Sequence, residues 1–268
     1  MQRTAILLFG ALAYGVFLGT FLYLVAFVGN LQATALAQWL PWLPDLVPHS
    51  IDFGRPTGTL PTAVAIDLGL LLLFGAQHSI MARTGFKAWL ARVLPRAAER
   101  STYVLLASLV LILLFWQWRP IPGVLWSAEG AVLQALAWSL FGFGFALVLV
   151  STFLIDHFDL FGLRQIWRNF VGGQPRAPRF STPLFYRLVR HPLYLGFIIA
   201  FLSAPEMTVG HALFATTLVA YILFAIRLEE RDLVRALGER YAVYQRQVPM
   251  LVPRLGAKIA PEGSPRSA

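Results

Sequence analysis

Long runs of apolar residues recur along this chain, and they restrict its fold more than any other feature. Residues 5–29, 62–81 and 131–155 form three such runs. Each run is long enough to cross about 30 Å of hydrocarbon as a helix. We therefore expect an all-α, polytopic transmembrane bundle.

The composition agrees with a membrane location. Hydrophobic residues make up 57% of the chain and charged residues only 13%, with a mean hydropathy of +0.65. Soluble domains carry about 25% charged residues. Because the chain contains no cysteine, it has neither disulfides nor a thiolate metal site, and we expect no metal. Any sulfur chemistry must involve a substrate or cofactor.

Shorter apolar runs complete a bundle of five to six spans. Residues 103–118 predict a third span, and a hairpin that begins at Pro183 or Pro192, turns near Pro205 and returns over 210–226 supplies the remainder. The first run is too long for a signal-peptide core and lacks a small-residue cleavage site, so we interpret it as a span. We expect transmembrane helices over 1–155, a cofactor-binding part over 156–254 and a flexible tail over 255–268.

Two polar segments predict helices of another kind. Residues 156–170 mix aromatic and charged side chains irregularly, which is typical of an interfacial helix. From Arg227 onward the chain is strongly charged, and Glu229, Leu233, Leu237, Tyr241 and Tyr244 recur at helical spacing. We expect one helix that carries these side chains on a single face.

The basic residues predict the orientation in the membrane. Of the 22 Lys and Arg residues, only Arg55 and Arg119 fall in the expected outer loops. Cytoplasmic loops are rich in Lys and Arg, so we expect both termini in the cytosol, at a bacterial inner membrane. The net charge is +9. The basic residues that give this charge lie beside apolar spans, which favours contact with membrane lipids over nucleic acid.

A cationic segment precedes the hairpin. Arg190 and His191 stand directly before Pro192, a residue favoured in the first turn of a helix. A helix N-terminus beside an arginine suits a carboxylate or phosphate. Tyr194 lies one turn inside, and Gly196 leaves room for a close approach.

The polar residues at the expected cytosolic face fit a nucleotide that carries a positive sulfur. Arg190 suits a carboxylate, and Glu229 or Glu230 can accept hydrogen bonds from ribose hydroxyls. Tyrosines in the same segments offer ring faces to an adenine or a sulfonium. This inventory matches S-adenosylmethionine.

Motifs in the same segments carry a resemblance to a known family. RHPLYLG at 190–196, LEERDL at 228–233, GERYAVY at 238–244 and VP at 248–249 occur in that order. The chain resembles the isoprenylcysteine carboxyl methyltransferase superfamily in these motifs. QHSIMAR at 77–83, ERSTYVLLAS at 99–108 and DHFDLFGLRQ at 156–165 are similar to a thiol-methylating branch, so the resemblance covers nearly the whole chain.

The resemblance implies methylation of a small volatile thiol, methanethiol, to dimethyl sulfide by S-adenosylmethionine, with S-adenosylhomocysteine as the second product. It implies cofactor-binding roles for eight residues of the motifs, to which we add Gly196. The eight are Arg190, His191, Tyr194, Glu229, Glu230, Arg240, Tyr241 and Tyr244.

A thiol reacts through its thiolate, so the site needs a base or a nearby cation. We consider His157, held by Asp156 and flanked by Asp159, and His78 as bases. We place Asp159 and Phe158 beside the substrate. Each base has a structural alternative, because His78 can satisfy backbone groups at a helix end, and the two aspartates can cap the interfacial helix.

Two other functions remain open from the sequence. One keeps the cofactor but changes the acceptor to an isoprenylcysteine carboxylate or a lipid amine. The other is a small-molecule channel or transporter, against which stand the lack of an internal repeat and the few intramembrane charges.

Overall fold

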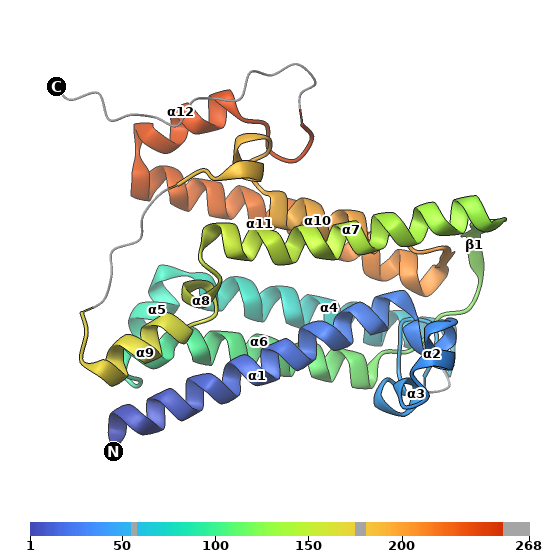
Figure 1. Cartoon of the computed structure of the whole chain (residues 1–268), viewed down its shortest axis with the longest axis horizontal. Coiled ribbons are helices and arrows are strands. Elements are labelled where there is room, and N and C mark those ends of the chain that lie inside the picture. The colour runs from blue at the N-terminus through green and yellow to red at the C-terminus, as the bar shows by residue number, and fades with distance from the viewer. Residues whose placement is uncertain (55–57, 175–180, 254–268) are drawn as a thin grey trace.

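The computed structural model describes residues 1–54, 58–174 and 181–253. Within these residues, five helices are long and apolar enough to cross a membrane (Figure 1). They are α1 (Gln2–Gly29), α4 (Leu60–Ala82), α6 (Arg96–Gln117), α7 (Ala131–Ile155) and α11 (Val209–Leu237). The predicted helical membrane bundle is confirmed. The expected flexible tail lies outside the described residues.

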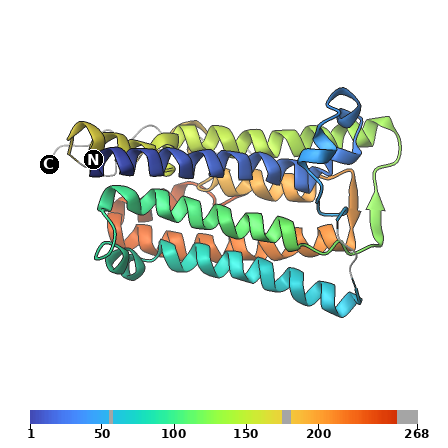
Figure 2. The same ribbon diagram turned by 90° about the horizontal axis from the view of Figure 1, so that it is seen from below.

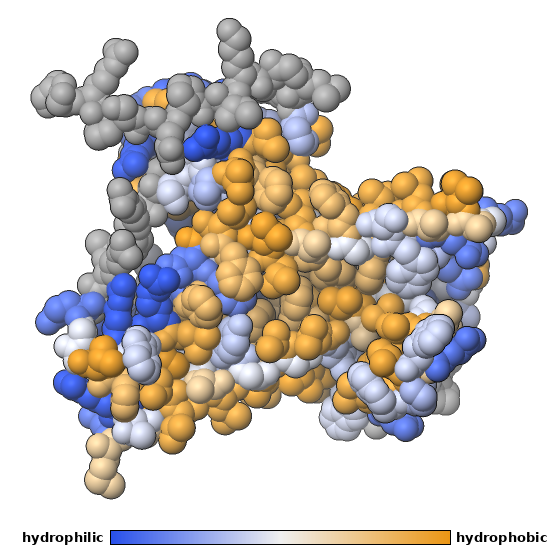
Figure 3. Space-filling model, viewed as in Figure 1, coloured by the Kyte–Doolittle hydropathy of each residue, from blue (hydrophilic) through white to orange (hydrophobic). Residues whose placement is uncertain are grey.

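The five long helices run side by side and separate two polar ends (Figures 1 and 2). The N-terminus, α5 (Thr84–Leu90), α8 (His157–Leu160), α9 (Leu163–Val171) and α12 (Glu239–Gln247) lie toward one end, which we call the basic end. The opposite end carries η1 (Leu31–Ala33), α2 (Leu36–Trp39), α3 (Leu43–Leu46) and two short strands. Figure 3 shows apolar side chains across the middle of one face, as contact with lipid requires.

The predicted fifth span is a short helix, α10 (Pro192–Leu202), that begins at Pro192 as expected. Its eleven residues extend only about 16 Å, which is too short to cross the hydrocarbon as a helix. It packs against α7 through two glycines. A Cβ atom added to Gly144 would lie 2.7 Å from the carbonyl oxygen of Gly196, and one added to Gly196 would lie 2.6 Å from that of Gly144. Small residues at such a contact let helix backbones approach closely.

Two helix boundaries differ from the prediction. Helix α6 begins at Arg96, seven residues before the apolar run, because charged residues continue the helix beyond the hydrocarbon. Helix α11 joins the sixth span to the charged segment in one element that ends at Leu237, directly before Gly238, where φ is +60°. The prediction that Glu229 and Tyr244 lie on a single face of one helix is therefore wrong, since Tyr244 lies on α12, after this break.

The expected interfacial helix is also two helices. The break between α8 and α9 falls at Gly162, whose φ is +88°. A Cβ atom there would lie 2.7 Å from the Ser101 hydroxyl oxygen. Glycine is needed at this position for both its conformation and its close contact with α6.

The end opposite the basic end contains structure that the sequence did not predict. Strand β1 (Val124–Ser127) pairs antiparallel with β2 (Glu206–Thr208). Asp67 is fully buried and accepts a hydrogen bond from the backbone N–H of Arg119 at 2.9 Å. His211 is also fully buried, with Nε2 2.9 Å from the carbonyl oxygen of Phe201.

Candidate active site

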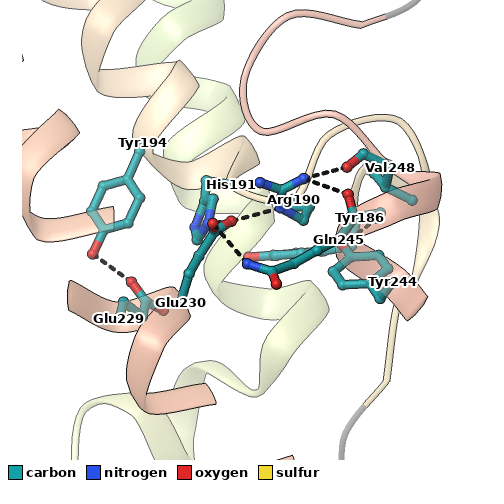
Figure 4. A network of polar contacts seen from close by, with 9 residues as sticks. All are labelled: Tyr186, Arg190, His191, Tyr194, Glu229, Glu230, Tyr244, Gln245 and Val248. Atoms are coloured by element: carbon teal, nitrogen blue, oxygen red, sulfur yellow. Dashed lines mark hydrogen bonds and ion pairs between the residues drawn. The ribbon is translucent and has the colours of Figure 1, made fainter. Parts of the chain in front are cut away.

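Glu230 of α11 is the centre of a polar network near the basic end (Figure 4). Its Oε1 atom lies 2.6 Å from Arg190 Nε and 3.0 Å from His191 Nε2, and its Oε2 atom accepts a hydrogen bond from Gln245 Nε2 at 3.0 Å. The Arg190 and Glu230 side chains are only 11% and 13% exposed. The network joins α10, α11 and α12.

Arg190 also binds the last turn of α12 and the chain that follows it. Its guanidinium donates to the carbonyl oxygens of Gln245 and Val248, at 3.0 and 2.5 Å. Its backbone N–H donates to Pro249, and that of His191 donates to Met250. The carboxylate that Arg190 binds in this structure is thus that of Glu230.

The two tyrosines of α12 extend the same network. Tyr241 is only 2% exposed, and Tyr244 donates its hydroxyl to the carbonyl oxygen of Tyr186 in η2 (Leu184–Arg187) at 2.5 Å. Their ring centroids are 5.7 Å apart. Burial raises the pKa of both phenols, so they remain neutral hydrogen-bonding and ring-stacking groups.

Glu229 faces a different neighbour from Glu230. Figure 4 shows it apart from the Arg190 network and pointing toward Tyr194. The Tyr194 hydroxyl donates to Glu229 Oε2 at 2.9 Å. Two adjacent glutamates therefore serve different contacts, one within the packed C-terminal part and one with a tyrosine of α10.

His78 of α4 is bound by a residue that the sequence did not suggest. The Tyr103 hydroxyl of α6 lies 2.8 Å from His78 Nε2. The other ring nitrogen, Nδ1, is buried and has no hydrogen-bond partner among the described residues. The motif ERSTYVLLAS contains Tyr103, but only the packing of α4 against α6 shows that His78 is the partner of Tyr103.

Tyr103 brings His78 close to charged residues of the neighbouring helices. Arg100 lies over its ring, 5.1 Å from the centroid, and Glu229 and Arg83 are close enough for their charges to act on it. Tyr194 is likewise within electrostatic range of Tyr103. The structure thus brings His78, Tyr194 and Glu229 into one neighbourhood, formed by α4, α6, α10 and α11.

His157 lies in a separate aromatic environment. Its Nε2 atom is 2.8 Å from the Tyr14 hydroxyl and its Nδ1 atom 2.8 Å from the Thr152 hydroxyl. The ring stacks on Phe153 at 4.2 Å between centroids. Burial lowers the pKa of His157. Both nitrogens are engaged, and neither contacts a carboxylate.

The prediction that Asp156 holds His157 is therefore wrong. Asp156 accepts a hydrogen bond from the backbone N–H of Asp159 at 3.1 Å and pairs with Arg164 at 2.9 Å. Its carboxylate is used as the N-cap of α8, because an aspartate at this position satisfies a free helix N–H.

The remaining predicted residues have simpler surroundings. Phe158 and Asp159 are exposed on α8, and Arg240 is exposed on α12. Gly196 faces α7, so the space left by its missing side chain is filled by helix packing. Among the described residues, no three His, Asp or Glu side chains form a group that could hold a metal ion.

Comparisons with known proteins cover nearly the whole chain. The NnrU protein family matches residues 68–253. A methanethiol S-methyltransferase of Crocosphaera subtropica is 48% identical over 258 residues, 96% of this chain and 95% of its own. Methanethiol S-methyltransferase 2 of Bradyrhizobium diazoefficiens is 50% identical over 96% of this chain and 93% of its own. The methanethiol S-methyltransferase of Mycobacterium tuberculosis is 46% identical over 94% and 98%.

A more distant similarity and one negative result complete the comparisons. Nurim of Sus scrofa is 34% identical over 63% of this chain and 68% of its own. No solved structure matches the chain. Given a family match over 186 consecutive residues and near-full-length relatives at almost half identity, the chain belongs to the NnrU protein family.

Proposed function

We propose that this protein transfers a methyl group from S-adenosylmethionine to methanethiol and releases dimethyl sulfide. The observation that supports this most strongly is the near-full-length similarity, at 46–50% identity, to three proteins named methanethiol S-methyltransferase.

The proposed reaction needs a group that takes the thiol proton, since the thiolate is the nucleophile. His78 suits this role. With Nε2–H donating to the Tyr103 hydroxyl, 2.8 Å away, the buried Nδ1 atom carries a lone pair that no described residue uses. Tyr103 is then a positioning residue that selects the tautomer and fixes the ring.

His157 is the less suitable of the two candidate bases. Hydroxyl groups of Tyr14 and Thr152 contact both of its nitrogens, so a proton from a thiol has no free acceptor there. The same contacts hold α1, α7 and α8 together. We propose a structural role for His157. We propose that Asp156 and Asp159 serve only to cap α8.

The residues near His78 fit the methyl donor. When bound, S-adenosylmethionine supplies an electrophilic methyl group on a sulfonium sulfur. Glu229 can exchange its Tyr194 contact for ribose hydroxyls, and the rings of Tyr194 and Tyr103 can face the sulfonium. Orientation contributes most to such a reaction, because sulfur and methyl must be held about 3–3.5 Å apart and in line.

We place this site at the cytosolic face of a bacterial inner membrane. From the end of α4 to the first turns of α6, the basic end carries Arg83, Lys87, Arg92, Arg96 and Arg100. Such basic segments remain in the cytoplasm. The methyl donor is made in the cytosol, whereas methanethiol is small and apolar enough to arrive through the lipid.

Gas chromatography tests the proposal directly. Cells that express the chain are given methanethiol, and the headspace is compared with that of cells carrying an empty vector. We expect a dimethyl sulfide peak only in the expressing cells. Equal headspace profiles, in cells whose membranes contain the protein, would overturn the proposed function.

A further inference from the structure

Arg190 is poorly placed to bind the carboxylate of the methyl donor. Its guanidinium already binds Glu230 and two carbonyl oxygens, and it is only 11% exposed. Breaking such a buried pair leaves an uncompensated charge. If the donor binds near Glu229 and His78, another group must bind its carboxylate, and a second cation would do so.

Lys87 of α5 lies one helical turn after Arg83, since its backbone N–H donates to the Arg83 carbonyl oxygen at 3.1 Å, and it is half-buried. Arg100 and Glu99 come from α6, Arg83 from the end of α4 and Asp232 from α11, and all four are close enough to act on its ammonium group. The Lys87 ammonium group forms no hydrogen bond or close ion pair with any described residue. Burial, followed by repulsion from Arg100, lowers its pKa.

The two arginines beside Lys87 contact neighbouring helices. Arg83 pairs with Asp232 at 2.8 Å and so connects α4 to α11. Arg100 donates to the carbonyl oxygen of Leu160 at 2.6 Å and lies over the ring of Tyr103, which contacts His78. Arg83 and Arg100 thus lie beside the helices that form the proposed reaction site.

We propose that Lys87, supported by Arg100, binds the carboxylate of the amino-acid half of S-adenosylmethionine. The inference rests on the proposed function and deepens it. The carboxylate neutralises a half-buried ammonium, which strengthens the attraction compared with a surface pair. It also places the amino-acid half at α5 and leaves Glu229 for the ribose hydroxyls.

Calorimetry with two ligands tests this inference without measuring activity. S-adenosylmethionine and its decarboxylated form, which lacks only the carboxylate, are titrated into purified protein in phosphatidylcholine nanodiscs. We compare the natural protein with Lys87→Met, with Lys87→Arg and with Arg92→Met, an exposed residue of the same basic segment. Thermal unfolding of each variant establishes that it is folded.

The expected result is selective. Lys87→Met weakens binding of S-adenosylmethionine by about tenfold to a hundredfold, the value of a charge-assisted hydrogen bond, and leaves binding of the decarboxylated ligand unchanged. Lys87→Arg keeps the charge and retains most of the affinity. Arg92→Met binds both ligands as the natural protein does.

Other results overturn the inference in distinguishable ways. If Lys87→Met weakens both ligands equally, or neither, the carboxylate is bound elsewhere and the proposed function stands. If the natural protein binds neither ligand, the proposed function fails as well. If Lys87→Met changes only the enrichment of phosphatidylglycerol in nanodiscs of mixed lipid, the anion at this site is a lipid phosphate.

Discussion

Replacing Glu230 with glutamine removes the negative charge that Arg190 and His191 share. Hydrogen bonds to charged groups contribute about 1.5–3 kcal/mol. Arg190 and Glu230 are only 11% and 13% exposed, so the pair is screened less than a surface pair, which contributes about 0–1 kcal/mol. We therefore expect Glu230→Gln to lower stability by about 1.5–3 kcal/mol. At about 2–4 °C per kcal/mol, the midpoint of thermal unfolding falls by roughly 3–12 °C.

The assay is thermal unfolding in detergent, followed through the fluorescence of the eight tryptophans. Arg190→Met and the double variant complete a double-mutant cycle. Coupling between the two sites of about 1.5 kcal/mol or more is expected. Additive effects, with each single variant as stable as the natural protein, would refute the reasoning that this pair holds α10 to α11.

Glu229→Gln is the matched control, one residue away in α11. Glu229 accepts a single hydrogen bond, from Tyr194, and a neutral glutamine oxygen can still accept it. We expect the unfolding midpoint to change by less than about 3 °C and the affinity for S-adenosylmethionine to fall. The two glutamates thus separate into one for stability and one for binding.

Two further predictions follow from other contacts. Gly144→Ala places a Cβ atom 2.6 Å from the backbone nitrogen of Ala200. We therefore expect the free energy of unfolding to fall by about 1–3 kcal/mol, measured by thermal unfolding. The control is Gly142→Ala, where a Cβ atom has nothing within 4 Å, and we expect its stability to be unchanged or slightly higher. His78→Ala lowers the rate of methyl transfer by about 10²–10⁴-fold and recovers part of it as pH rises, because solvent then supplies thiolate; a pH profile with the natural shape would remove His78 as the base.

The membrane helices could be predicted from the sequence because each depends on a local property. Residues 131–155 were expected to form a span and form α7 over the same residues. The start of α6 at Arg96 was missed, because hydropathy marks where the hydrocarbon ends and says nothing about where helical hydrogen bonding ends. The sequence predicts a continuous helix through Gly238, because a single glycine gives no indication in the sequence that its φ is positive.

Long-range pairings could not be predicted. His157 contacts Tyr14 across 143 positions of sequence, and nothing local distinguishes this contact from the expected one with Asp156. The sequence indicates no function for Tyr103, because its contact with His78 exists only when α6 lies beside α4. The motif around Arg190 did identify residues that come together, although their carboxylate partner is Glu230 of the chain itself.

Transfer of an isotopic label tests the central claim most directly. The purified protein in vesicles is given methanethiol and S-adenosylmethionine with a trideuterated methyl group, and the headspace is analysed by mass spectrometry. The account predicts dimethyl sulfide that is three mass units heavier, formed in proportion to the protein added. Dimethyl sulfide without the label, or none above the level of empty vesicles, would contradict it.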